Sequence, residues 1–80
     1  MNNLRSNQRR RILKSGKIGF NGGGAIDAMV RNLSETGALL HVESILDIPN
    51  DFTLFIDADN FKRQCKIVWR NPTKIAVRFV

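Results

Sequence analysis

Two groups of residues in this chain of 80 have side chains suited to an anionic ligand. The first is a run of arginines near the N-terminus, Arg5, Arg9, Arg10 and Arg11, with no lysine before Ile12. A guanidinium group makes paired hydrogen bonds to phosphate or to the O6/N7 edge of guanine, and its plane stacks on bases, whereas lysine binds phosphate as a point charge. The use of arginine therefore favours recognition of a planar group such as a guanine base, although a solvated basic tail has the same composition.

The second group is a polar turn at Asn32–Gly37, set between the apolar runs Ala25–Val30 and Ala38–Val42. Turns on a rigid frame often carry binding residues. The side chain of Asn32 offers a base edge both an amide donor and a carbonyl acceptor. We expect a short helical turn here, capped by Asn32 with Glu35 three residues further on, before the chain returns into a strand.

The remaining reactive side chains form no catalytic or metal-binding pattern. His41 is the only histidine, Cys65 is the only cysteine, and Ser34 lies outside any nucleophile motif. One cysteine and one histidine do not complete a closed zinc site, and a serine without a partner base is not an activated nucleophile. Cys65 alternates with apolar neighbours and is expected to be a small buried hydrophobe. We therefore predict no enzyme activity, no metal and no cofactor.

Length and composition set the class of protein. Eighty residues make one domain, and 42% apolar with 25% charged residues are ordinary values for a globular chain. Thirteen Lys and Arg against 7 Asp and Glu give a net charge of +6, which favours an anionic partner. The sequence has no secretory signal, no apolar run of about 18 residues and no second cysteine for a disulfide. We expect a cytoplasmic protein without membrane insertion.

Alternation of apolar and polar residues predicts six short strands. It runs through residues 12–20, 25–31, 38–42, 52–56, 61–70 and 75–79, with turn residues between neighbouring segments. No segment carries an apolar stripe of helical period over three turns. The pattern predicts an all-β fold, a small six-stranded antiparallel β-barrel over residues 12–80, preceded by a flexible arginine-rich arm over residues 1–11.

The aromatic residues are divided by their phase in these strands. Phe52, Trp69 and Phe79 alternate in step with aliphatic residues, so we expect them in the core. Phe55 is out of step and is expected on the outer face. The run Gly22–Gly24 lacks the Lys-Ser/Thr of a phosphate-binding loop, so it is interpreted as a hairpin turn.

The two polar motifs together resemble the PilZ domain family. In that family an Arg-x-x-x-Arg precedes the first strand, here Arg5–Arg9, and an (Asp/Asn)-x-Ser-x-x-Gly turn joins the second and third strands, here Asn32–Gly37. The stretches Ile67–Arg70 and Ala76–Phe79 are also similar to the family. The likeness covers the chain from Arg5 onward. It implies a split-barrel fold that binds the bacterial second messenger cyclic di-GMP without catalysis.

The resemblance also implies roles for the motif residues. Arg5 and Arg9 would hold guanine edges and phosphates from the arm, and Arg10 and Arg11 are alternative candidates for the second arginine. Asn32 and Ser34 would bond a guanine and a phosphate, and Gly37 would let the backbone approach the ligand. Binding would order the arm at a cost of about 1–2 kcal/mol per residue fixed. A downstream protein would then recognise the ordered arm, with the receptor acting as a monomer or a homodimer.

Two other functions stay open on the sequence. A small basic barrel can bind single-stranded nucleic acid on exposed aromatics beside a basic groove, which here would require Trp69 and Phe55 exposed near Arg70. A PilZ-like barrel can also lose its ligand and serve as a protein-interaction module, although the retained arginines argue against this. Many family members add a helix after the last strand. This sequence reaches Val80 on the strand itself, so bulky side chains or a second subunit are expected to cover that barrel end.

Overall fold

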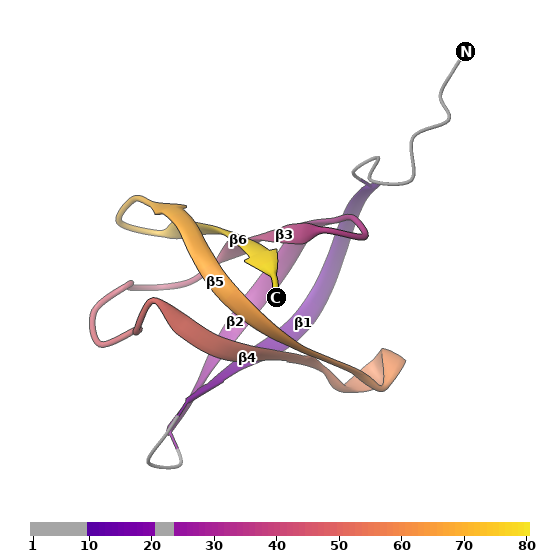
Figure 1. Cartoon of the computed structure of the whole chain (residues 1–80), viewed down its shortest axis with the longest axis horizontal. Helices are drawn as coiled ribbons and strands as arrows, with labels where there is room; N and C mark the ends of the chain where they lie inside the picture. Colours follow the sequence, from indigo (N-terminus) through magenta and orange to yellow (C-terminus); the bar gives the residue numbers. More distant parts are fainter. Residues whose placement is uncertain (1–9, 21–23) are drawn as a thin grey trace.

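The computed structural model describes residues 10–20 and 24–80, and these form one closed antiparallel barrel (Figure 1). Within the described residues the strands are β1 (Arg10–Phe20), β2 (Gly24–Leu33), β3 (Gly37–His41), β4 (Asp51–Ile56), β5 (Phe61–Arg70) and β6 (Lys74–Phe79). Their order around the barrel is β1-β2-β3-β6-β5-β4, and β1 closes the ring by pairing with β4. A single 3-10 turn, η1 (Asp57–Asp59), joins β4 to β5. The predicted all-β, six-stranded barrel is confirmed.

The core consists of the inward face of each alternating strand. In β4, Phe52, Leu54 and Ile56 are buried while Thr53 and Phe55 between them are partly exposed. The largest fully buried side chains come from all six strands: Ile18, Val30, Leu40, Phe52, Leu54, Ile56, Cys65 and Ile75. No polar or charged side chain is buried among the described residues. Apolar packing therefore fills the barrel, and its polar chemistry lies on the outer surface.

Side chains of the same chain cover both ends of the barrel. At one end the β3–β4 loop folds inward, with Ile48 buried in the core and Ile45 packed against it. The Arg70 guanidinium fixes this loop by donating to the Ile48 carbonyl at 3.0 Å. At the other end the rings of Phe61 and Phe79 pack with their centroids 5.6 Å apart, beneath the Arg63 guanidinium. Bulky side chains, one of the two expected arrangements, are therefore present at each end.

A β-bulge in β5 moves Trp69 out of the core. Ile67 pairs with Val77, whereas Trp69 already pairs with Ala76, so Val68 is an extra residue on β5. An extra residue reverses the alternation of the side chains that follow it. Trp69 is consequently 47% exposed and Val68 is 60% exposed. The prediction that Trp69 belongs to the core is wrong, because sequence alternation alone does not reveal the bulge.

The first strand begins earlier than the sequence pattern suggested. We expected it at Ile12, but β1 starts at Arg10, whose Cα pairs with Leu33, and Arg11 pairs with Asn32 of β2. Two residues of the predicted arm are therefore strand residues. The rest of that arm, residues 1–9, lies outside the described residues, and so do residues 21–23, which include most of the hairpin turn predicted at Gly22–Gly24.

Gly37 is required by the packing of β3 on β6. A Cβ atom at this position would clash with the Val77 carbonyl oxygen and lie 3.2 Å from the Arg78 Cα. Both neighbours belong to the backbone, so neither can move aside without opening the sheet.

Replacing Gly37 by alanine should therefore destabilise the barrel. For Gly37→Ala we expect a loss of about 2–3 kcal/mol in the free energy of unfolding, measured by urea denaturation. The matched control is Gly19→Ala, where a Cβ meets the end of the Phe55 ring, a side chain able to rotate away. The control should lose less than about 1 kcal/mol. Equal losses in the two variants would contradict the clash with the β6 backbone.

Candidate ligand-binding site

Ser34 organises the turn between β2 and β3. Its backbone N–H donates to the Gly37 carbonyl at 2.9 Å. Its side-chain Oγ accepts hydrogen bonds from the amides of Thr36 and Gly37, both at 3.2 Å. A serine hydroxyl that accepts two backbone donors in this way fixes a tight turn without positive φ angles. Ser34, a predicted site residue, is thus held rigidly on the barrel frame.

The expected helical turn capped by Asn32 is wrong. Asn32 belongs to β2, where its Cα pairs with Leu39 on one side and with Arg11 on the other. A bulge at Arg31 adjusts the register, since Val30 pairs with Leu40 and Asn32 already pairs with Leu39. The capping hydrogen bonds come from Ser34, the third residue of the motif. Asn32 is half-buried.

The register of β1 on β2 brings the beginning of β1 beside this turn. Arg10 pairs with Leu33 and Arg11 with Asn32, so the first residue of β1 lies next to the last residue of β2 (Figure 1). Of the predicted arginine candidates, Arg10 and Arg11 fall within the described residues, both as strand positions. Arg5 and Arg9 lie outside them. The remaining predicted positions, Asn32, Ser34 and Gly37, come together at one end of the barrel.

A row of outer-face residues extends from Asn32 across the sheet. Asn32 pairs with Leu39, Leu39 with Ala76, and Ala76 with Trp69. Neighbouring strands lie about 4.8 Å apart, so this row spans about 14 Å. Arg78, which pairs with Gly37, is exposed and adds positive charge beside the row. From the sequence we expected Trp69 in the core and gave Arg78 no role in the site.

The two aromatics that a nucleic-acid surface would require do not lie together. Phe55 pairs with Lys62, and the Lys62 ammonium group lies 5.9 Å from the centroid of the Phe55 ring. Trp69 follows seven residues later in β5, which is about 23 Å along an extended strand. The guanidinium of Arg70 donates to the Ile48 carbonyl at 3.0 Å and to the side-chain oxygen of Asn50. The arrangement predicted for the single-stranded nucleic-acid alternative is therefore not formed.

Cys65 is a buried, free cysteine, as the sequence predicted. Burial raises the pKa of its thiol from 9.0 to about 11, although a backbone hydrogen bond at Leu54 and the charge of Arg63 act in the opposite direction. The side chain is thus a neutral thiol at physiological pH, which is unsuited to nucleophilic chemistry.

The described residues contain no group of three or more His, Cys, Asp or Glu arranged to hold a metal ion. In the same part of the chain, no helix has the length and apolar character needed to cross a membrane.

The chain belongs to the PilZ domain family. The family model described as PilZ domain matches residues 3–80, nearly the whole sequence. This confirms the resemblance inferred from the two motifs. The family is one of receptors for cyclic di-GMP, and its members are generally not catalysts. No curated protein matches the chain.

The hydrogen bonds of Ser34 make its contribution to stability testable. Ser34→Ala removes the acceptor for two turn amides, so we expect a loss of about 1 kcal/mol in the free energy of unfolding. Ser34→Thr keeps the hydroxyl and should recover most of this loss. Urea denaturation of the three proteins provides the comparison. If the threonine variant were as unstable as the alanine variant, the hydroxyl would not be what fixes the turn.

The raised pKa of Cys65 predicts a stability change at alkaline pH. Below pH 9 the thiol is protonated in both folded and unfolded chains, and its contribution is complete. Between pH 9 and 11 the unfolded chain loses the proton first, so stability falls, by about 2–3 kcal/mol at most. Cys65→Ala should show a shallower decline when reduced proteins are unfolded in urea at pH 8 to 11. Parallel pH profiles would contradict this.

Proposed function

We propose that this protein is a non-catalytic receptor for cyclic di-GMP, which binds between the Arg5–Arg9 motif and the Asn32–Gly37 turn. The observation that carries the proposal is the pairing of Arg10 with Leu33, because it makes the residue directly after the arginine motif a neighbour of the turn. Membership of the PilZ family supplies the ligand class. In the absence of this pairing the two motifs would have no structural reason to act together.

The chemistry of the two motifs is complementary. Cyclic di-GMP carries two phosphates and two guanines, so it requires both positive charge and bidentate donors. In our proposal Arg5 and Arg9 supply these, with Arg10 as the alternative second arginine. Asn32, already half-buried on the frame, supplies a donor and an acceptor for a guanine edge.

Ser34 is suited to contact a phosphate without releasing the turn. Its oxygen accepts from two amides, which leaves the hydroxyl proton as the group available to a ligand. Within the turn this proton has two acceptors, the Gly37 carbonyl and the Thr36 hydroxyl, each at a long 3.3 Å. Exchange of either for a phosphate oxygen would therefore cost little and form a stronger, charge-assisted bond.

The output is proposed to follow from the arm. Binding would fix residues 5–9 against the barrel at a cost of about 1–2 kcal/mol per residue, which the phosphate and guanine contacts must exceed. The fixed arm and the dinucleotide would together form a surface that a downstream protein recognises.

Isothermal titration with cyclic di-GMP tests this function. Arg9→Ala should weaken binding about 10- to 100-fold, as expected for the loss of a charge-assisted contact of about 1.5–3 kcal/mol. Asn32→Ala should weaken it too, and Arg9→Lys should recover only part of the loss, since lysine restores charge but not the bidentate fork. Lys74→Ala is the matched control, because it removes one charge at the opposite end of the barrel.

Ligand controls separate this function from its alternatives. Cyclic di-AMP keeps the phosphates but lacks the guanine O6 edge, and GTP lacks the cyclic backbone, so both should bind far more weakly. A ten-residue oligothymidylate tests the single-stranded nucleic-acid alternative, which the exposed Trp69 alone favours. The proposal fails if wild type gives no heat with cyclic di-GMP, or if Arg9→Ala and Asn32→Ala both leave the affinity unchanged.

A further inference from the structure

Half of β2 has an edge without a partner strand. β3 pairs with β2 only from Met29 to Leu33, whereas Gly24–Ala28 pair with β1 alone. β3 ends at His41 and separates there from β2. The next amide, of Val42, donates instead to the Thr73 carbonyl at 2.8 Å. Within the described residues, no backbone hydrogen bond joins Gly24–Ala28 to any element other than β1. This segment, the free β2 edge, is about 17 Å long.

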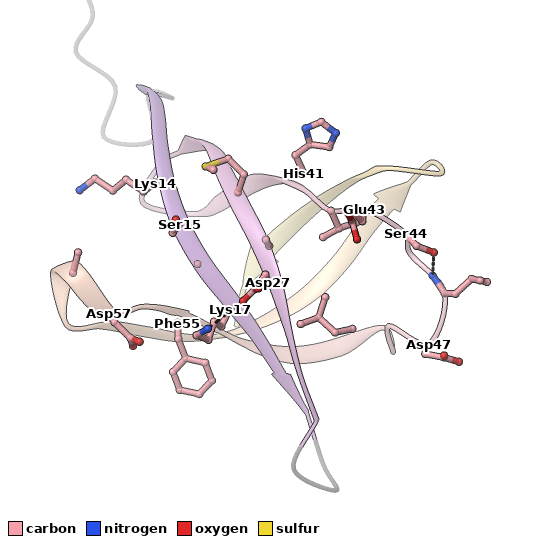
Figure 2. Close-up of a pocket in the computed structure, with 17 residues that line it drawn as sticks. Lys14, Ser15, Lys17, Asp27, His41, Glu43, Ser44, Asp47, Phe55 and Asp57 are labelled. Atoms are coloured by element: carbon pink, nitrogen blue, oxygen red, sulfur yellow. Dashed lines mark hydrogen bonds and ion pairs between the residues drawn. The ribbon is translucent and has the colours of Figure 1, made fainter.

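An open groove of about 1220 Å³ reaches the free β2 edge at Ile26, Asp27 and Ala28 (Figure 2). Its floor is the outer surface of the β1–β2 ribbon, including Ser15 and Asp27. One wall is the β3–β4 loop, which exposes Leu46 to 76%, and the other contains the half-buried ring of Phe55 at the end of β4. The groove thus combines unpaired backbone groups with apolar side chains on both walls.

The groove carries more negative than positive charge, in contrast to the chain as a whole. Four of the seven acidic residues of the sequence line it: Asp27, Glu43, Asp47 and Asp57. Its two lysines are engaged in ion pairs, Lys14 with Asp59 at 2.6 Å and Lys17 with Asp27 at 3.1 Å. Figure 2 shows carboxylates on both sides of the ribbon. On a chain of net charge +6, this surface is suited to a cationic occupant and not to a dinucleotide.

We propose that the free β2 edge binds an extended basic segment of a partner protein by β-strand addition. The segment would pair with the backbone of Gly24–Ala28, direct its Lys or Arg side chains to Glu43 and Asp47, and place apolar side chains against Leu46. A second copy of this chain is a poorer occupant, because pairing through the same edge would oppose two acidic grooves. This site is independent of the turn, which lies at the other end of β2.

A short synthetic peptide that alternates lysine with valine over eight residues is the probe. When it saturates the protein, amide hydrogen exchange followed by NMR should slow at least tenfold at positions within Gly24–Ala28 and remain unchanged at Ser34 and Gly37. The same peptide, N-methylated at alternate residues, keeps its charge but cannot pair, and should bind at least tenfold more weakly in fluorescence anisotropy. Glu43→Gln should weaken the unmodified peptide several-fold, whereas Asp51→Asn, an acidic position outside the groove, should not.

Several outcomes overturn this proposal. The proposal is wrong if the peptide does not bind, or if its N-methylated form binds equally well. It is also wrong if the peptide slows amide exchange at the β2–β3 turn and not at the free β2 edge. A dimer in sedimentation, with the edge amides already protected before peptide is added, would assign the edge to a second copy of the chain. Cyclic di-GMP affinity should be the same in wild type and Glu43→Gln, so this test is separate from that of the receptor function.

Discussion

The long pairing of β1 with β2 is the constraint on which the rest of the structure depends. These are ten- and eleven-residue strands, while β3, β4 and β6 have only five or six residues each. β1 holds β2 along one edge and closes the barrel through β4 along the other. The register fixes both ends of this ribbon. At one end Arg10, the first residue of β1, lies beside Leu33 at the end of β2, and at the other end β2 extends beyond the reach of β3.

We place both proposed functions on the outer surface because the described interior has no polar side chains. The core is apolar throughout the described residues, and its one reactive side chain, Cys65, is held as a neutral thiol by burial. Recognition must therefore come from strand ends, turns and edges. The two surfaces we propose differ in charge, since arginines accompany the turn while carboxylates line the groove. In this proposal, the opposite charge of the two surfaces separates an anionic ligand from a basic partner segment on a domain of 80 residues.

Much of this fold could be predicted from the sequence. The alternation of Phe52, Leu54 and Ile56 identified a buried strand face, and the turn residues between segments identified the connections. The limits were the bulges, of which the described strands have three, between Arg11 and Lys14, at Arg31 and at Val68. At Val68 and Arg31 one extra residue reverses the alternation, and it is the partner strand that decides where such a residue is accommodated. Trp69 was therefore assigned to the wrong face.

The sequence identified which residues belong to the candidate site, but not the structural role of each one. The motif drew attention to Asn32, Ser34 and Gly37, and all three lie at one barrel end. Their local roles depend on contacts that no single segment specifies. Asn32 is a strand residue because Arg11 and Leu39 pair with it, and Gly37 must lack a side chain because the Val77 carbonyl occupies that space.

The central claim, that arm and turn form one site, is tested most directly by an NMR titration of isotope-labelled protein with cyclic di-GMP. We predict coincident shifts in the backbone amides of Asn32, Ser34 and Gly37 and in the arginine side-chain Nε–H signals. With Arg9→Ala the shifts at the turn should require a much higher ligand concentration. Shifts at the turn that are indifferent to Arg9→Ala, or shifts confined to Gly24–Ala28, would contradict the claim.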